Sequence, residues 1–137
     1  MRIQKLKSKH ALTMLCLVVT LLTACQASPR QGLDGRPDPE KIRFRIDDID
    51  ADGLRGPAGG QVSVSYEFCV PANAQVYRQL RQIDAGLQIN PGASGRSGCT
   101  KDQALGIGDT GQPGWRRVLD ALTSLDYVSA IRECFFE

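Results

Sequence analysis

Gln61-Val62-Ser63-Val64-Ser65-Tyr66-Glu67-Phe68-Cys69 is the stretch that decides the fold, because polar and apolar residues alternate along most of it. Successive side chains of a β-strand point to opposite faces, so this alternation predicts a strand with one face against a core. The side chains expected to point inward are those of Val62, Val64, Tyr66 and Phe68. We therefore expect a sheet in which this strand is central.

Two amphipathic helices are predicted downstream of this strand. The first follows Asn73, a residue type that caps helix N-termini, and Gly86 is expected to end it in the left-handed conformation. Its apolar face comprises Val76, Leu80 and Ile83. The second helix is expected to hold Pro113 in its first turn. Its apolar stripe comprises Trp115, Val118, Leu119, Leu122 and Leu125.

Short apolar segments complete the predicted domain. Three further strands are expected, at residues 87–90, 104–107 and 127–136. From residue 61 onward the order is strand, helix, strand, strand, helix, strand. This order predicts an α+β domain with a ferredoxin-like βαββαβ antiparallel sheet and two helices on one face. Residues 41–47 also alternate and predict an extra N-terminal strand, either on an outer edge or in a hairpin with 61–69.

The N-terminus has the pattern of a secretory signal. A segment with four basic residues precedes the apolar run 11–22, which is too short to span a bilayer. The run ends in Leu22-Thr23-Ala24-Cys25. This order resembles the lipobox of bacterial lipoproteins, in which the cysteine is acylated and becomes the new N-terminus. The resemblance implies a signal peptide at 1–24 and lipidation of Cys25, with several acyl chains giving a stable membrane anchor.

The residue after the lipobox cysteine predicts which of the two bacterial membranes holds the anchor. In the lipoproteins that this signal resembles, an aspartate there retains the protein at the inner membrane, whereas this chain has Gln26. The resemblance therefore implies an outer-membrane anchor that faces the periplasm. Residues 25–40 are rich in proline and glycine and predict a flexible tether. Residues 41–137 are expected to form a single small domain.

Composition excludes several classes of function. Without the signal, the chain keeps 13 of its 17 basic residues and all 15 acidic ones, a net charge of −2. No basic face for nucleic acid is therefore expected. The single histidine, His10, lies in the signal, so the predicted mature chain has no histidine for catalysis or metal binding. We expect a protein that is not an enzyme and needs no cofactor.

Three cysteines remain beside Cys25. Cys69 ends the central strand, and Cys99 lies in a glycine-rich loop expected at the same end of the sheet. Cys134 is expected at the opposite end, so we predict a Cys69–Cys99 disulfide. Cys134 is then a free thiol. It is interpreted either as a small buried apolar residue or as a reactive group.

Two motifs have a functional interpretation beside a structural one. Asp48, Asp50 and Asp52 match the first half of an EF-hand loop and could bind Ca²⁺, although Gly59 stands where that loop has a glutamate. The alternative is a solvated acidic turn. Residues 106–111 spell the Gly-x-Gly-x-x-Gly pattern of dinucleotide-binding proteins, which we interpret as a glycine-rich turn because the chain is small.

The leading functional hypothesis is a lipid-anchored envelope protein that contacts or regulates another envelope protein. Its support is the predicted anchor, the tether and the small domain, whose sheet edges could accept an added strand. The alternative is a lipoprotein that binds calcium or a small ligand through Asp48–Asp52.

Overall fold

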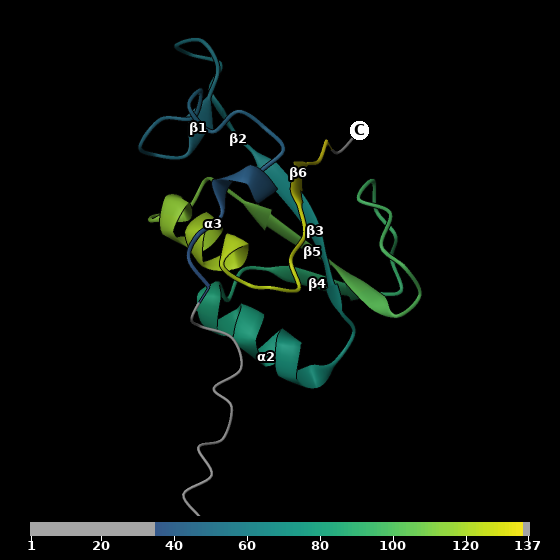
Figure 1. The fold of residues 1–137 in the computed structure, drawn as a ribbon. Coiled ribbons are helices and arrows are strands. Elements are labelled where there is room, and N and C mark those ends of the chain that lie inside the picture. Colours follow the sequence, from purple (N-terminus) through teal and green to yellow (C-terminus); the bar gives the residue numbers. More distant parts are fainter. Residues whose placement is uncertain (1–34, 136–137) are drawn as a thin grey trace, which may run out of the picture. The chain divides into compact units, whose positions relative to one another are not determined.

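The computed structural model describes residues 35–135, so the predicted signal peptide, Cys25 and the first part of the predicted tether lie outside the described residues. Within this described range, two α-helices and six strands confirm the α+β class (Figure 1). The helices are α2 (Ala74–Ile83) and α3 (Trp115–Thr123), and a short 3₁₀ helix, η2, spans Pro39–Lys41. The strands are β1 (Leu54–Arg55), β2 (Val62–Ser63), β3 (Ser65–Pro71), β4 (Gln88–Pro91), β5 (Gln103–Asp109) and β6 (Ile131–Glu133).

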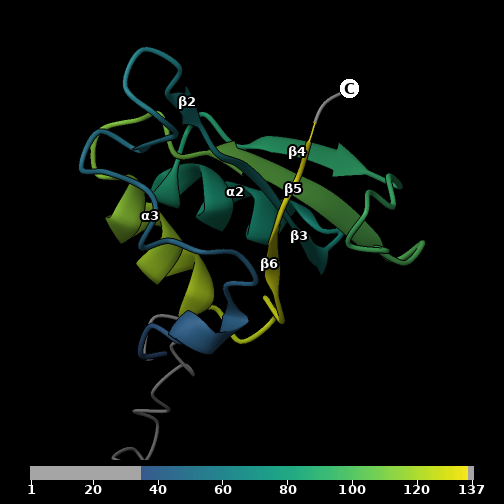
Figure 2. The same ribbon diagram turned by 90° about the horizontal axis from the view of Figure 1, so that it is seen from above.

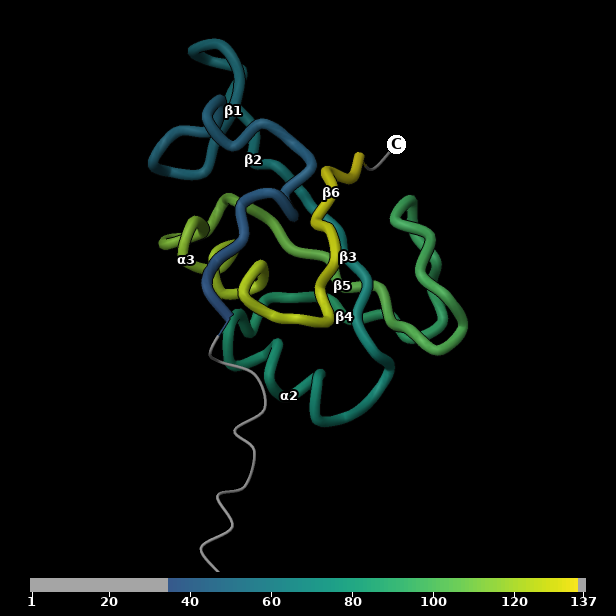
Figure 3. The backbone as a smooth tube through the Cα atoms, in the orientation of Figure 1, coloured from purple at the N-terminus to yellow at the C-terminus, as the bar shows by residue number. Residues whose placement is uncertain are grey.

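The strands form two antiparallel sheets. The larger sheet has the order β4-β5-β3-β6, and β1 pairs with β2 in a separate two-stranded sheet (Figure 3). Strand β3 is central and pairs with β5 along its whole length, from Ser65 opposite Asp109 to Pro71 opposite Gln103. The stretch 61–69 thus contributes both β2 and the start of β3.

Figure 2 shows both helices beside the larger sheet, and residues from the sheet and from both helices form one apolar cluster. Alternate side chains of β3 enter it, together with residues from α2 and α3. Its largest fully buried members include Tyr66, Phe68, Leu80, Trp115, Leu119 and Leu122. Val62 was expected to point inward but is 61 % exposed. It lies on β2, which pairs with β1 and not with the larger sheet.

The ends of the helices differ in part from the expectation. The side chain of Asn73 accepts a hydrogen bond from Val76 N at 2.9 Å, so the predicted N-cap of α2 is confirmed. The prediction that a left-handed Gly86 ends α2 was wrong: Asp84 ends it in an extended conformation, with φ −150°. Its carboxylate accepts a hydrogen bond from Gly86 N. Helix α3 begins after Gly114, whose φ of +76° favours glycine, so Pro113 lies before the helix.

The strand predicted at 41–47 is not formed over that range. Ile42 makes a single parallel bridge with Ile131 of β6, and Arg43 N donates to Ile131 O at 2.8 Å. The Nζ of Lys41 donates to Thr123 O and Leu125 O at the end of α3. Apolar side chains from this segment still pack against the core cluster. The alternation therefore reflects burial on one side, while the backbone turns away along the outer edge of β6.

The last strand is shorter than the predicted range 127–136, since only Ile131–Glu133 pair with β3. Arg55 of β1 holds this strand through a two-bond ion pair with Glu133, which joins the small sheet to the larger one. No helix within residues 35–135 has the length and apolar character needed to cross a membrane.

Candidate functional site

The predicted disulfide is confirmed. Cys69 and Cys99 are bonded, with their Cα atoms 5.4 Å apart. The bond fixes the loop between β4 and β5 to β3. In the same loop, Ser97 N donates to the carboxylate of Glu67, which is only 4 % exposed on the face of β3 opposite the helices. The loop therefore covers part of the sheet face that the helices leave open.

Cys134 lies at the other end of β3, where its backbone N donates to Ser65 O at 2.9 Å. It is a free thiol and is buried. Burial raises the pKa of the Cys134 thiol, and the negative charge of Glu67 raises it further. A raised pKa keeps the thiol protonated, and a thiol is a poor nucleophile. The geometry thus favours the interpretation of Cys134 as a buried apolar residue.

The three aspartates of the predicted calcium loop have separate contacts. Asp48 forms an exposed ion pair with Arg45, at 3.1 Å. Asp50 accepts hydrogen bonds from Asp52 N and Leu54 N, and from the side chain of Gln61. Within residues 35–135, no three acidic, histidine or cysteine side chains are grouped as a metal site requires. Calcium binding by Asp48, Asp50 and Asp52 stays a prediction.

The glycines at 106 and 108 have a packing role. They lie on β5 directly opposite Phe68 and Tyr66 of β3. A Cβ atom at Gly106 would lie 2.7 Å from the ring of Phe68, so the aromatic ring occupies the space that a side chain would need. This contact explains the first two glycines of the Gly-x-Gly-x-x-Gly pattern without a nucleotide.

The edges of the larger sheet offer little backbone for an added strand. Gly92 N donates to Gln103 O, which sets the register between β4 and β5. In an antiparallel pair only every second residue bonds its neighbour, so the backbone groups of Ile89 and Pro91 point away from β5. Proline has no N–H, so Ile89 supplies the one outward donor of β4. The edge of β6 is partly occupied by the contact with residues 42–43. Both edges are therefore poor sites for strand addition.

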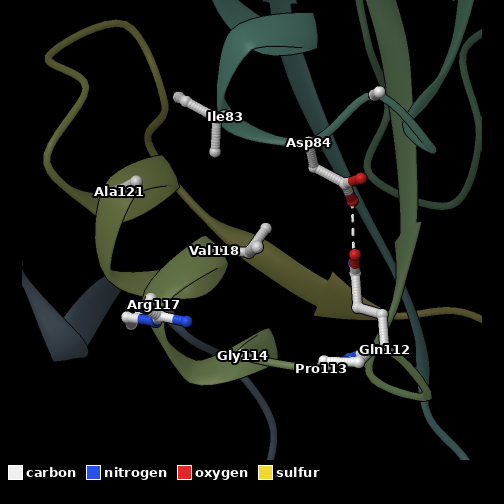
Figure 4. A pocket seen from close by; sticks show the side chains of 9 residues that line it. Ile83, Asp84, Gln112, Pro113, Gly114, Arg117, Val118 and Ala121 are labelled. Atoms are coloured by element: carbon white, nitrogen blue, oxygen red, sulfur yellow. Dashed lines mark hydrogen bonds between the residues drawn. The ribbon is translucent and has the colours of Figure 1, made fainter.

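A pocket of about 440 Å³ lies between the C-terminal end of α2 and the N-terminal end of α3. This volume is within the usual range of small-ligand pockets, roughly 300–1,000 Å³. Its polar and apolar walls come from both helices, and Figure 4 shows Arg117 on the opposite side from Asp84 and Gln112. The lining includes Ile83, Asp84, Gln112, Gly114, Arg117 and Val118.

The two charged side chains of the pocket have different environments. Asp84 is fixed, because its carboxylate accepts hydrogen bonds from Gly86 N at 2.7 Å and from Gln112 Nε2 at 2.8 Å. Arg117 is exposed, and its guanidinium has no hydrogen bond or ion pair with any other described residue. Its guanidinium lies over Gly114, where a Cβ atom would be 2.9 Å from Nη2. The cation is therefore available to a ligand.

The helix termini reinforce these charges. The C-terminus of a helix has a partial negative charge and the N-terminus a partial positive charge. Asp84 stands at the C-terminal end of α2, and Arg117 lies in the first turn of α3, which has no side-chain cap. One side of the pocket is therefore negative and the other positive. Val118 supplies apolar surface between them, and Ile83 is a further apolar residue of the lining.

The charge of Asp84 also influences the pKa of a buried tyrosine hydroxyl. Tyr66 is 1 % exposed, and its hydroxyl has no hydrogen-bond partner in the part of the chain that the structure describes. Burial raises the pKa of Tyr66, and the negative charges of Asp84 and Asp109 raise it further. This phenol stays protonated at neutral pH and contributes no charge to the pocket.

Sequence reasoning missed the pocket. Asp84, Gln112 and Arg117 belong to no motif, and Asp84 and Arg117 are 33 positions apart in the chain. The available signal was the position of charges at the predicted helix ends, which becomes informative only once the two helices are known to be neighbours. No family model, curated protein or solved structure matches this chain.

Proposed function

We propose that this chain is a lipid-anchored, non-enzymatic binding module of the bacterial envelope. Acylated Cys25 would hold it in the outer membrane with the domain in the periplasm, as the lipobox and Gln26 imply. The tether would let the domain reach a partner at some distance from the bilayer. The expected partner is another envelope protein, which the module contacts or regulates.

The observation that carries the binding function is the pocket between α2 and α3. It combines a fixed anion, Asp84, with apolar surface and a cation, Arg117, that forms no ion pair with another residue of the range 35–135. The convergence of a few polar groups and some apolar surface on one hollow is typical of recognition sites. The groups that catalysis would use are less suited to it, since Cys134 is buried and protonated and Ser63 and Ser65 both donate to Asp109.

In-cell crosslinking followed by mass spectrometry tests this function. We compare the wild-type protein with Cys25→Ser, which removes the anchor, and with Arg117→Gln, which removes the cation of the pocket. One stoichiometric envelope partner, lost in both variants, is the expected result. Arg132→Gln is the matched control, because Arg132 is also exposed and lies on β6, outside the pocket. Recovery of abundant bystanders alone, in every sample, contradicts the proposal.

We also propose a ferredoxin-like arrangement for the domain. Its support is the succession β3, α2, β4, β5, α3, β6 and the antiparallel order β4-β5-β3-β6. Both helices contribute to the same core cluster as the alternate side chains of β3. An experimental structure with the same strand order would support the proposal, and a different order would contradict it.

A further inference from the structure

We infer that the pocket between α2 and α3 binds a short zwitterionic peptide. The amino group would lie at Asp84, the carboxylate at Arg117, and an apolar side chain would lie against Ile83 and Val118. This inference rests on the proposed binding function and specifies the ligand class. The argument comes from the charges, the apolar surface and the size of the pocket.

The charges require a ligand with both signs. Asp84 uses its carboxylate to accept two hydrogen bonds, from Gly86 N and Gln112 Nε2, and a carboxylate can accept about four. It therefore retains acceptor capacity for an ammonium group. The guanidinium of Arg117 has five N–H donors and no bonded partner among the described residues, so it can bind a carboxylate in a bidentate manner.

The separation of the charges favours a peptide over a single amino acid. An amino acid has its ammonium and carboxylate on one carbon atom. In the pocket the corresponding side chains stand on opposite sides, with Val118 between them (Figure 4). A ligand that contacts both must place several bonds between its charged ends. A short peptide with free termini does so, and its central side chain can contact the apolar wall.

The helix ends favour the same orientation of the peptide. The N-terminal end of α3 is near Arg117 and adds positive potential where the ligand carboxylate would lie. The C-terminal end of α2 adds negative potential beside Asp84. A peptide bound in the reverse direction would place each of its charges against a like charge. The pocket thus discriminates orientation as well as charge.

Isothermal titration with the tripeptide Ala-Leu-Ala tests the inference, using the full lipidated chain in detergent micelles. Two blocked peptides, one N-acetylated and one C-amidated, remove one ligand charge each. Saturable binding of the free peptide is expected. Each blocked form should bind about tenfold more weakly, the loss expected for a hydrogen bond to a charged group.

Double-mutant cycles assign each ligand charge to its residue. Arg117→Gln should weaken the free peptide about tenfold but leave the amidated peptide almost unchanged, because the carboxylate is already absent. Likewise, Asp84→Asn should weaken the free peptide about tenfold but leave the acetylated peptide almost unchanged, because the ammonium group is already absent. The control variants Arg132→Gln and Asp126→Asn, exposed residues outside the pocket lining, should bind like the wild type. If Asp84→Asn unfolds, the Arg117 cycle alone decides, since the guanidinium of Arg117 is exposed and bonds no described residue.

The outcomes separate this inference from the proposed function. Absence of saturable binding at millimolar peptide overturns the inference, as does equal weakening of all three peptides by Arg117→Gln. If the peptide does not bind but crosslinking to an envelope partner depends on Arg117, the ligand class is wrong and the binding function stands. If the peptide binds with the expected couplings but no partner is crosslinked, the inference stands and the protein partner is wrong.

Discussion

The ring of Tyr66 covers Gly108 on the neighbouring strand, and a Cβ atom at position 108 would lie 2.5 Å from its Cζ and hydroxyl oxygen. Two residues along, Phe68 covers Gly106 in the same way. Glycine weakens a strand because it has no side chain to pack, and an aromatic ring on the opposite residue can restore that packing. These pairs join β3 to β5 under the two helices.

Gly108→Ala should destabilise the domain by about 1–3 kcal/mol, the usual cost of overpacking a core. Neither strand glycine has a positive φ, so the cost would come from the contact with the ring and not from the backbone. Urea unfolding monitored by tryptophan fluorescence measures it. Gly60→Ala is the matched control, because a Cβ atom there has no neighbour closer than 3.8 Å. Equal stability of the Gly108 and Gly60 variants contradicts this account of the glycine pair.

The central residues of strand β3 and helix α3 could be predicted because the sequence patterns that indicate them are local. Alternation in β3 and the stripe from Trp115 to Leu122 each report burial on one side of an element. At 41–47 the same alternation was present, but Lys41 bonds the carbonyl groups at the end of α3 and the backbone leaves the strand path. The pattern fixes which side chains are buried, whereas pairing of the backbone depends on distant residues.

In the candidate site, the disulfide could be predicted from the sequence and the pocket could not. The Cys69–Cys99 pair was predictable because sheet topology sets which end of a strand each cysteine occupies. The pocket was not predictable, because it depends on how the end of α2 meets the start of α3. The end of α2 itself was misassigned to Gly86, and Asp84 is fixed there by a local bond from Gly86 N together with a tertiary bond from Gln112.

Replacing Cys69 and Cys99 together by alanine should cost roughly 3–4 kcal/mol of unfolding free energy. A disulfide that closes a loop of this length restricts the unfolded chain, and the loop entropy sets the magnitude. Urea midpoints of the variant and the oxidised wild type provide the measurement. Reduction of the wild type should lower stability to a similar extent. A variant as stable as the oxidised protein would show that the bond adds nothing to the stability of the fold.

Cys134 should resist thiol reagents in the folded protein. Its side chain is buried and burial raises its pKa, so both access and thiolate formation are suppressed. Labelling with a maleimide should be slow in buffer and complete in denaturant, at a native rate that follows the population of unfolded molecules. Cys134→Ala provides the blank. Rapid labelling of the native wild type would instead favour the reactive-thiol interpretation.

Asp50 should be a structural residue of its turn whether or not calcium binds. Asp50→Ala removes acceptors for Asp52 N and Leu54 N and should cost about 0.5–1.5 kcal/mol for each bond not replaced by water. Asp52→Ala is the control, because its carboxylate has no hydrogen bond with other described residues. Thermal unfolding with and without millimolar CaCl₂ tests the calcium prediction in the same samples. A calcium-dependent rise in Tm that both variants lose would support a site at Asp48, Asp50 and Asp52.

Stability should fall as pH rises above about 9, because the buried Tyr66 and the half-buried Tyr127 hold their protons more tightly than the unfolded chain does. Burial raises the pKa of Tyr127 to about 12, whereas an unfolded tyrosine has a pKa of about 10. Between these values the unfolded state binds fewer protons than the folded state, so the free energy of unfolding decreases with pH. Tyr66, whose pKa is also raised by burial, acts in the same direction.

Urea unfolding at pH 7, 9 and 10.5 should show a progressive loss of stability, and Tyr127→Phe should make the dependence on pH shallower. At pH 7 that variant loses the 2.8 Å bond from the Tyr127 hydroxyl to Gln79 Oε1, which should cost about 1 kcal/mol. Because this cost is already present at pH 7, it can be separated from the effect of ionisation, which changes the slope with pH. An unchanged slope in Tyr127→Phe would show that this phenol ionises alike in both states.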